Sequence, residues 1–406
     1  SSGTTNDKSK FLPVTPEILK GCHYKGGFDT VSIYLRNYPD SHFFAGKGLI
    51  LGGSHSPSPL NRNAHCGDLS AVLLQNLNPL VNLIRVPDKK IILMDEWESK
   101  IKAIVESTWK ADVNSLSGVP SWMLVLIKAV LQKAGSEYLT DVWPNMEVFF
   151  HGGISFEPYR DQYKALIPSN RMHYMETYNA SEGFFGLQDD PAEHSLLLMI
   201  DYGVFYEFIP INEVGREHPT VLPLEAVEVG KNYAMVITTS GGLWRYQIGD
   251  TIRFTSLYPH KFVISGRTKN FINAFGEELM VDNADKAISS VCRQTGAKVK
   301  EYTAAPLFML DKAKGRHQWM IEFEKMPPSL DDFASLLDKA LQQLNSDYEA
   351  KRYKEISLQP LKIQVAREGT FYEWLRRKGK LGGQHKIPRL SNDRTFIEEL
   401  EKIYNL

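Results

Sequence analysis

The first ten residues, SSGTTNDKSK, are dense in hydroxyl side chains around a single glycine. Gly3 permits backbone conformations that other residues resist, and successive backbone N–H groups around such a turn form a nest that binds anions. Because Ser1, Ser2, Thr4 and Thr5 add hydroxyl donors, the stretch predicts a loop that holds phosphates. It is not a Walker loop, since the chain contains no G-x-x-x-x-G-K-[ST]. A flexible Ser/Gly linker is an equally good interpretation of these residues alone.

A second stretch, TYNASEGFFG at residues 177–186, combines an aromatic ring and a carboxylate with a run of small residues. Tyr178 stands four positions before Glu182, and the small residues between them let the backbone approach a flat ligand. Magnesium takes oxygen ligands from carboxylates together with nucleotide phosphates, so Glu182 is a candidate metal ligand. A polar loop in which Ser181 starts a helix explains the same residues equally well.

A third stretch, WRYQIGDTIRF at residues 244–254, carries Asp250 directly after a glycine. A carboxylate accepts two hydrogen bonds, which suits the paired hydroxyls of a ribose. Considered alone, Asp250 is better explained as an ordinary turn residue.

The basic residues Arg267 and Lys269 in SGRTKN and Lys386 in GGQHKIPR are further candidate site residues. Taken singly they predict only charged loops, because most lysines and arginines lie on solvated surfaces.

The segments that position these stretches alternate between helix-like and strand-like up to about residue 266, which indicates an α/β core. Residues 146–150 form an apolar run that leads to Gly153, and residues 173–178 lead into the second stretch in the same way. Ligands of open α/β sheets bind where strands end in loops, so both loops are well placed for chemistry. The apolar residues 122–131 are too few for a membrane span of about 20 residues and predict a buried helix.

The chain beyond this core predicts a separate, smaller domain. The expected elements are a helix at 281–293, strands at 302–310 and 318–324, a helix from 329 and a strand at 356–365. They suggest a βαββαβ order, as in a small α+β, ferredoxin-like domain. The sequence therefore predicts a large α/β domain over residues 1–266 and a small α+β domain over residues 267–406.

Charge and composition limit the partners. The 406 residues carry 47 Lys and Arg against 48 Asp and Glu, so the net charge is −1. No global charge favours nucleic acid or an anionic membrane, no obligate protein partner is evident, and small molecules are the expected partners. Three cysteines are too few for a disulfide framework and indicate a reducing, cytoplasmic setting. Two adjacent Cys/His pairs lack zinc-site spacing. Because Ser1 is neither an initiator methionine nor the start of a signal peptide, we expect residues upstream of it.

The order and spacing of the stretches resemble one family. A Tyr-x-x-Ser-Glu motif is matched by residues 178–182, an Arg-Tyr-x-x-Gly-Asp motif by residues 245–250, and a Gln-x-Lys-x-Pro-Arg motif by residues 384–389. With the Ser/Thr/Gly loop at residues 1–5, these motifs resemble the auxin-responsive acyl-acid amido synthetases, the Gretchen Hagen family, in a bacterial-type version. That family belongs to the acyl-adenylate-forming superfamily, which includes firefly luciferase and the acyl-CoA ligases.

The resemblance implies an ATP-dependent ligase with two half-reactions. An acyl acid attacks ATP to give acyl-AMP and pyrophosphate, and the amine of an amino acid then attacks the acyl carbon and releases AMP. ATP and Mg²⁺ are the implied cofactors. The Ser/Thr/Gly loop would hold the β- and γ-phosphates, Glu182 the Mg²⁺, and Asp250 the ribose. Gly153 would let adenine lie against the backbone, and Tyr178 would stack near the adenine or line the acyl site.

Lys386 has the implied catalytic role of bridging the carboxylate and the α-phosphate in the first transition state. It lies in the predicted small domain, so a rotation about residues 267–270, beside Arg267 and Lys269, would insert and withdraw it. Residues 119–122 and 154–156 are candidates for the acyl pocket, although core packing explains most of them better.

Two other functions fit the same motifs. An acyl-CoA ligase shares the first half-reaction and differs only in its acceptor, a thiol. A nucleotide-binding regulatory protein without turnover is the second alternative. Lys386 and Glu182 argue against it, because binding alone does not require a movable lysine.

Overall fold

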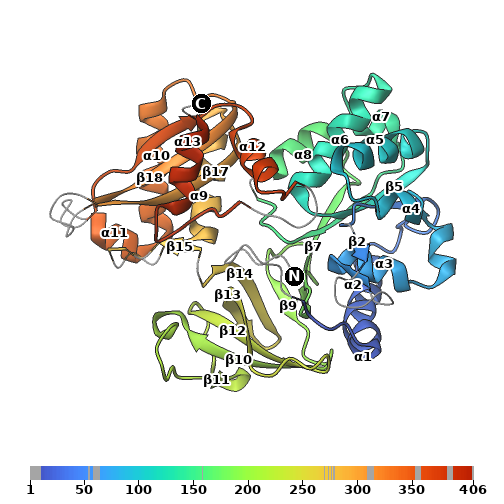
Figure 1. Cartoon of the computed structure of the whole chain (residues 1–406), viewed down its shortest axis with the longest axis horizontal. Helices are drawn as coiled ribbons and strands as arrows, with labels where there is room; N and C mark the ends of the chain where they lie inside the picture. The colour runs from blue at the N-terminus through green and yellow to red at the C-terminus, as the bar shows by residue number, and fades with distance from the viewer. Residues whose placement is uncertain are drawn as a thin grey trace.

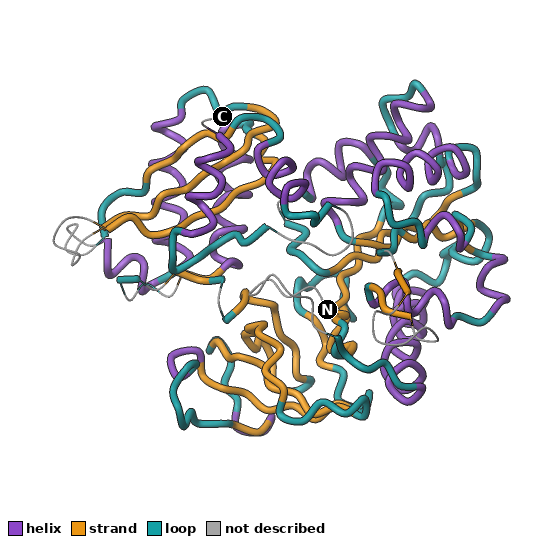
Figure 2. The backbone as a smooth tube through the Cα atoms, in the orientation of Figure 1, coloured by secondary structure: helices purple, strands orange, loops and turns teal. Residues whose placement is uncertain are grey.

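The computed structural model describes residues 11–53, 55–57, 65–157, 159–268, 270–272, 274–275, 277, 279–308, 315–352, 358–381 and 387–404. Figure 1 shows a large part built on a twelve-stranded sheet and a smaller C-terminal part at the upper left. In Figure 2 the helices gather in the C-terminal part and on the right-hand side, whereas the region at the lower left consists mainly of strands. Within the described ranges, no helix combines the length and apolar character needed to cross a lipid bilayer.

The large sheet is parallel at one end and antiparallel at the other. Strands β7, β6, β5, β1 and β4 run parallel to one another, and the remaining neighbours pair antiparallel. In spatial order the strands are β11 (Leu222–Pro223), β10 (Val204–Pro210), β12 (Asn232–Thr239), β13 (Tyr246–Leu257), β14 (His260–Arg267), β9 (Leu196–Leu198), β8 (Gly183–Leu187), β7 (His173–Ala180), β6 (Val148–Gly152), β5 (Val113–Gly118), β1 (Lys47–Ile50) and β4 (Arg85–Val86). The predicted strands at 146–150 and 173–178 are confirmed as the adjacent strands β6 and β7.

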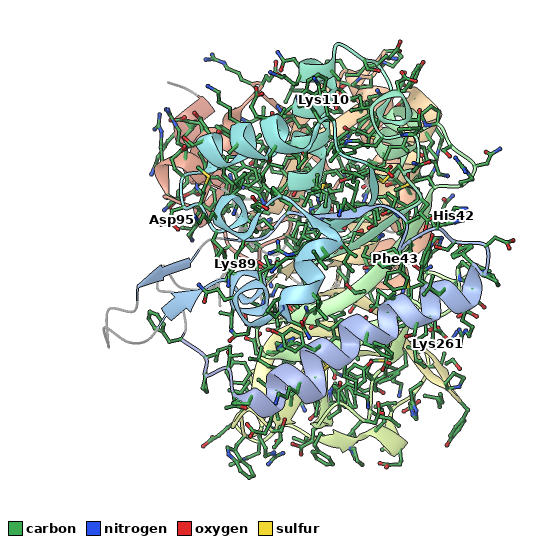
Figure 3. The ribbon with its side chains drawn as sticks, turned by 90° about the vertical axis from the view of Figure 1, so that its right-hand side faces the viewer. His42, Phe43, Lys89, Asp95, Lys110 and Lys261 are labelled. Carbon is green, nitrogen blue, oxygen red and sulfur yellow. The ribbon has the colours of Figure 1, made fainter. Side chains whose placement is uncertain are left out.

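Most helices of the large part surround its parallel strands (Figure 1). They are α1 (Pro16–Ile18), the π-helical η1 (Leu19–Tyr24), α2 (Lys25–Asn37), α3 (Leu69–Asn76), α4 (Lys89–Ile92), α5 (Trp97–Thr108), α6 (Pro120–Ala134), α7 (Leu139–Val142) and α8 (Arg160–Leu166). Short 3-10 turns, η2 (Pro79–Leu83), η3 (Ile211–Glu213) and η4 (Leu224–Ala226), and a hairpin of β2 (His55–Pro57) with β3 (His65–Gly67) complete this part. The long helix α2 crosses the side of the molecule seen in Figure 3, with Phe43 labelled above it.

Helix α6 is the predicted buried helix. Seven of its apolar side chains are at most 7 % exposed: Trp122, Met123, Leu124, Leu126, Ile127, Val130 and Leu131. The helix ends at Gly135, whose φ of 67° is a left-handed conformation that favours glycine. Because α6 follows β5 directly, its first turn lies next to the carboxyl end of that strand.

The C-terminal part contains a three-stranded sheet with helices around it. Its elements are β15 (Phe271–Ile272), β16 (Leu279–Met280), α9 (Val281–Thr295), β17 (Lys298–Phe308), β18 (Gly315–Lys325), α10 (Leu330–Leu344), α11 (Ser346–Arg352), β19 (Lys362–Ala366), α12 (Thr370–Arg377) and α13 (Thr395–Tyr404). The predicted α+β character is confirmed, and one detail differs. Strand β19 lies beside β18 and parallel to it, whereas the split βαβ of a ferredoxin-like sheet leaves a strand between such partners.

An apolar cluster joins the two parts. Trp97 and Trp122 of the large part lie edge to face with ring centroids 4.7 Å apart. They belong to one buried cluster with Phe371 and Trp374 of α12 and Phe396 of α13. In Figure 1, α12 accordingly lies between the C-terminal sheet and the helices of the large part.

Candidate active site

The candidate site is a cavity of about 1150 Å³ at the carboxyl ends of β1, β5, β6 and β7. Its opposite wall comes from β13, β14 and the start of α9. Five predicted site residues line it: Gly153, Tyr178, Glu182, Asp250 and Arg267. Segments that are distant in the sequence therefore meet where the parallel strands end, which is the usual ligand position in an α/β sheet.

Asp250 is held from two sides. The pairing of β13 with β14 brings Asp250 opposite Arg267, and Arg267 Nε lies 2.9 Å from Asp250 Oδ1. Tyr178 Oη donates a hydrogen bond to the other carboxylate oxygen, Oδ2. The preceding Gly249 has a φ of 87°, and its carbonyl accepts a hydrogen bond of 2.8 Å from the backbone N–H of Thr268. The carboxylate is therefore fixed in orientation, and its oxygens retain lone pairs for a further donor.

Tyr178 is itself rigidly placed. Its ring meets Phe185 and Phe262 edge to face, at centroid distances of 5.1 and 6.2 Å. Burial, together with the neighbouring Asp250 carboxylate, raises the pKa of Tyr178 well above its usual value, so the hydroxyl remains a donor. This contact with Asp250 is a role that the sequence did not indicate.

Glu182 lies at the tip between β7 and β8 and is only 8 % exposed. Burial raises the pKa of its carboxyl group, and the nearby Asp250 carboxylate adds to the rise. A cation in the cavity would oppose both effects, because an opposite charge favours the ionised carboxylate. A cation bound in the cavity would therefore stabilise the ionised form of Glu182.

At the end of β6, Gly152 and Gly153 expose a stretch of backbone that carries no side chains. A Cβ atom on Gly152 would lie 2.2 Å from the carbonyl oxygen of Thr177 on the adjacent strand, so no side chain fits there. Gly153 has a φ of 83°, which favours glycine. This wall of the cavity can therefore be approached closely by a flat ligand.

The two segments considered for the acyl pocket both contribute to the cavity wall. Their lining residues are Val119, Trp122, Ile154, Ser155 and Phe156. Trp122 and Phe156 are also at most 7 % exposed and belong to the core. Core packing and cavity lining are thus combined in the same side chains.

Arg389, the last residue of the motif near the C-terminus, forms a buried charge network. Its guanidinium pairs with Asp285 and lies 3.5 Å from a carboxylate oxygen of Glu301. It also donates a 3.1 Å hydrogen bond to Tyr159 Oη. Because Tyr159 belongs to the large part and the two carboxylates to the C-terminal part, Arg389 connects the two parts beside the cavity, which Arg389 and Asp285 line.

Several predicted site residues lie outside the described residues. These are Ser1, Ser2, Gly3, Thr4, Thr5, Lys269 and Lys386. Ile387, which directly follows Lys386, does line the cavity.

The adjacent Cys22 and His23 have ordinary structural partners. Cys22 Sγ accepts a 3.1 Å hydrogen bond from the backbone N–H of Phe184, and His23 Nδ1 lies 2.9 Å from Asn179 Oδ1. Across the described ranges, no three His, Cys, Asp or Glu side chains are grouped so as to hold a metal ion.

Other polar residues of the cavity were not predicted. Glu176, His151 and Arg160 all line it. His151 directly precedes the two glycines of β6, and Glu176 precedes Tyr178 by two residues on β7. Arg160 opens α8, far from both in the sequence, so no local signal marked these residues as a group.

The fold is that of the adenylate-forming enzymes. A GH3.15 acyl acid amido synthetase superposes with a TM-score of 0.77 at 18 % identity, over 100 % of this chain and 80 % of that chain. A 2-hydroxyisobutyryl-CoA ligase superposes with a TM-score of 0.54 at 13 % identity, over 93 % of this chain and 73 % of that one. At these identities, the likeness establishes the architecture alone.

Family models identify the chain more closely. The GH3 family N-terminal domain matches residues 1–172, the central domain residues 197–267, and the C-terminal domain residues 282–395. The chain belongs to the GH3 family, in agreement with the resemblance of its motifs.

Two curated relatives show how far the sequence has diverged from characterised members of the family. Indole-3-acetic acid-amido synthetase GH3.8 of Oryza sativa subsp. indica is 30 % identical over 302 residues, which cover 68 % of this chain and 49 % of the relative. Indole-3-acetic acid-amido synthetase GH3.3 of Arabidopsis thaliana is 29 % identical over 287 residues, which cover 65 % and 46 %. The chain thus spans about half the length of these relatives.

Proposed function

We propose that the protein is an ATP-dependent acyl acid–amino acid ligase that forms an amide through an acyl-AMP intermediate. Membership of the GH3 family supports this class of reaction. The observation that carries the proposal is the fixed Asp250 carboxylate, which lines one cavity together with Glu182 and the Gly153 backbone.

The nucleotide would lie across this cavity. Asp250 would accept hydrogen bonds from the ribose hydroxyls, with Tyr178 and Arg267 holding its carboxylate in place. Adenine would lie against the main chain at Gly153. In this proposal the triphosphate is held by the Ser/Thr/Gly loop of residues 1–5, with Lys269 beside it.

Glu182 fits a magnesium ion. The ion usually takes one or two carboxylates together with substrate phosphates, and Glu182 is a buried carboxylate that faces the cavity. When bound, magnesium would offset the negative charge of the phosphates. Glu182 would hold it at the strand tip, close to the triphosphate.

In this proposal the two half-reactions differ in whether Lys386 is needed beside the reacting atoms. In the first, an oxygen of the acyl acid carboxylate attacks the α-phosphorus of ATP and pyrophosphate leaves, with Lys386 stabilising the charge that develops there. In the second, an amine attacks the acyl carbon and AMP leaves. We propose that residues 1–266 and 267–406 form two domains, and that rotation about residues 267–270 withdraws Lys386 between the steps.

The substrates in this proposal are a small acyl acid and an amino acid, in a cytoplasmic setting. The apolar wall at Val119, Trp122 and Ile154 supports an aromatic or aliphatic acid. The fold is shared with CoA ligases, so an acyl-CoA ligase remains the alternative. The GH3 family match favours the amide.

The first test is acid-dependent exchange of labelled pyrophosphate into ATP, with a panel of aromatic and aliphatic carboxylic acids. At least one acid should support exchange, and Asp250→Ala should weaken it by raising the KM for ATP. Lys231→Ala is a matched control, because Lys231 pairs with Glu228 on the surface and should leave exchange unchanged. The absence of exchange with every acid, while nucleotide still binds, would favour a non-catalytic protein.

A further inference from the structure

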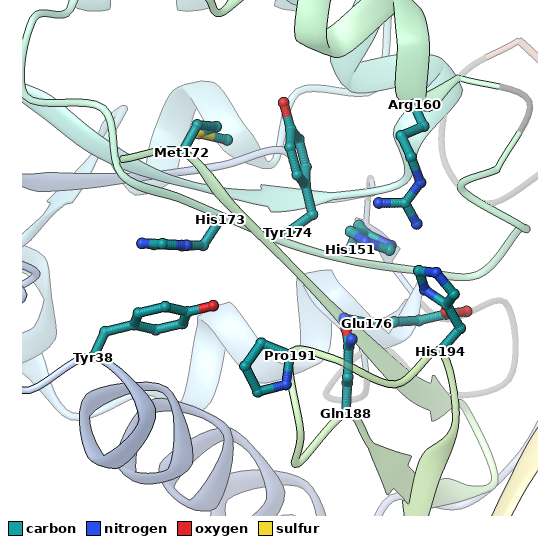
Figure 4. A pocket seen from close by; sticks show the side chains of 10 residues that line it. All are labelled: Tyr38, His151, Arg160, Met172, His173, Tyr174, Glu176, Gln188, Pro191 and His194. Atoms are coloured by element: carbon teal, nitrogen blue, oxygen red, sulfur yellow. Dashed lines mark hydrogen bonds between the residues drawn. The ribbon is translucent and has the colours of Figure 1, made fainter. Parts of the chain in front are cut away.

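A second, smaller cavity adjoins the candidate active site. It has a volume of about 160 Å³, and four of its residues also line the large cavity: His151, Arg160, Glu176 and His194. Figure 4 shows these four gathered at one end, while Tyr38 and His173 lie at the other. The small cavity therefore adjoins the large one at the end that carries Arg160 and Glu176.

Two residues that line this cavity each carry a buried polar atom without a hydrogen-bond partner among the described residues. These atoms are Nδ1 of His151 and the hydroxyl of Tyr174. His151 is only 3 % exposed, and its ring stacks on Phe156 at a centroid distance of 4.2 Å. The cavity wall itself is polar, because Arg160, Glu176, Gln188 and His194 line it, so the cavity suits a polar occupant.

The shared end of the cavity carries one charge of each sign. Arg160 Nε lies 2.9 Å from Glu157 Oε2, and the guanidinium lies over the Phe156 ring at 4.9 Å, which leaves its terminal nitrogens toward the cavity (Figure 4). The Glu176 carboxylate makes no hydrogen bond with any side chain that the structure describes. The charged groups that influence its pKa are Arg160 and Asp282. An arginine and a carboxylate that do not pair with each other can hold the two ends of a zwitterion.

The volume restricts the occupant. At about 30 Å³ for each water molecule, the cavity holds roughly five waters, or one small polar molecule. We propose that this cavity binds the acceptor amino acid, with Arg160 holding its α-carboxylate and Glu176 receiving the proton of its ammonium group. This inference rests on the proposed amide synthesis and names the acceptor site for it.

The proposed step balances as follows. The ammonium group transfers one proton to the Glu176 carboxylate and becomes a neutral amine. The nitrogen lone pair forms a bond to the acyl carbon of acyl-AMP, and the bond from that carbon to the phosphate oxygen breaks, so AMP leaves with the electron pair. The nitrogen releases its second proton to solvent, and Glu176 returns its own proton to solvent before the next turnover.

The protonation states suit this step. Burial raises the pKa of Glu176 to about 7, against an opposing effect of Arg160 and a smaller upward effect of Asp282. A general base is most effective when its pKa lies near the working pH. Burial, with the Arg160 charge, lowers the pKa of His151 to about 3, so this ring is neutral. The other titratable side chains that line this cavity are Tyr38, Arg160, His173, Tyr174 and His194.

The test compares acceptors with and without the carboxylate. Using the acid found by pyrophosphate exchange, each of the twenty amino acids is tried as acceptor, and the best one is compared with its α-carboxamide. The wild type should prefer the amino acid, and Arg160→Gln should raise its KM about 10- to 100-fold and abolish that preference. Arg293→Gln is the matched control, because Arg293 also contacts Glu157, at 3.3 Å, and does not line the cavity. Loss of the preference in both variants would overturn the role of Arg160.

Hydroxylamine separates this inference from the proposed function. It is uncharged at neutral pH and has no carboxylate, so its acyl hydroxamate should form at wild-type rate in both Arg160→Gln and Glu176→Gln, which also shows that the variants fold. Glu176→Gln should slow amide formation about 100-fold or more and remove the pH dependence near 7. An unchanged amide rate in Glu176→Gln would overturn the proton transfer. Failure of hydroxamate formation in the wild type would instead contradict the proposed function.

Discussion

Replacing Tyr178 with phenylalanine should weaken ATP binding about tenfold without unfolding the protein. The change removes only the hydroxyl, so the edge-to-face contacts with Phe185 and Phe262 remain. A hydrogen bond to a charged group contributes about 1.5–3 kcal/mol, which corresponds to roughly 10- to 150-fold in binding. We expect the lower end of this range, because Arg267 still holds Asp250 and water from the cavity can replace the lost donor.

The assay is the ATP dependence of acid-stimulated pyrophosphate exchange, with thermal unfolding measured in parallel. Tyr206→Phe is the matched control, since Tyr206 is also buried, and its hydroxyl donates a 2.9 Å hydrogen bond to the carbonyl of Met199, away from Asp250. It should lower stability in the same way and leave the KM for ATP unchanged. An unchanged KM in Tyr178→Phe, or an equal rise in both variants, would refute the assignment of Tyr178 to the orientation of Asp250.

Three further predictions concern charge. Glu182→Gln should abolish Mg²⁺-dependent pyrophosphate exchange at every MgCl₂ concentration; exchange restored by high MgCl₂ alone would mean that Glu182 is not essential. Lys386→Ala should slow adenylation by roughly 10²–10³ but slow amide formation from preformed acyl-AMP much less, and single-turnover rates showing equal losses would contradict domain alternation. Glu176 has a pKa raised from 4.5 to about 7 by burial, so its contribution to stability is present below pH 4.5 and lost as the pH rises through 7. In calorimetry, Glu176→Gln should therefore gain in Tm relative to the wild type between pH 4 and pH 8, whereas a constant difference would show that Glu176 ionises freely in the folded state.

Short motifs made two residues of the candidate site predictable. Glu182 and Asp250 were predicted from short stretches, and both line the same cavity. The support of Asp250 by Arg267 was not predictable, since it depends on the register of β13 with β14, which brings the two residues opposite each other. Register follows from pairing over whole strands, and a short motif does not record it.

The rest of the site lacked a local signal. Glu176 and Arg160 have unremarkable neighbours in the sequence, and their significance arises only when β7 and α8 bring them to the same cavity. In the C-terminal part the α+β character was predicted correctly, but helices α11, α12 and α13 and the parallel pairing of β18 with β19 were not. Periodicity indicates the type of each element and leaves open which edge of a sheet the chain returns to after a helix.

The most direct test of the account is the identity of the product. The protein is incubated with ATP, MgCl₂, the acid that supports pyrophosphate exchange, and the twenty amino acids and CoA together, and the products are identified by mass spectrometry. The account predicts an amide between the acid and an amino acid, formed in equal amount with AMP. A CoA thioester without any amide would contradict it.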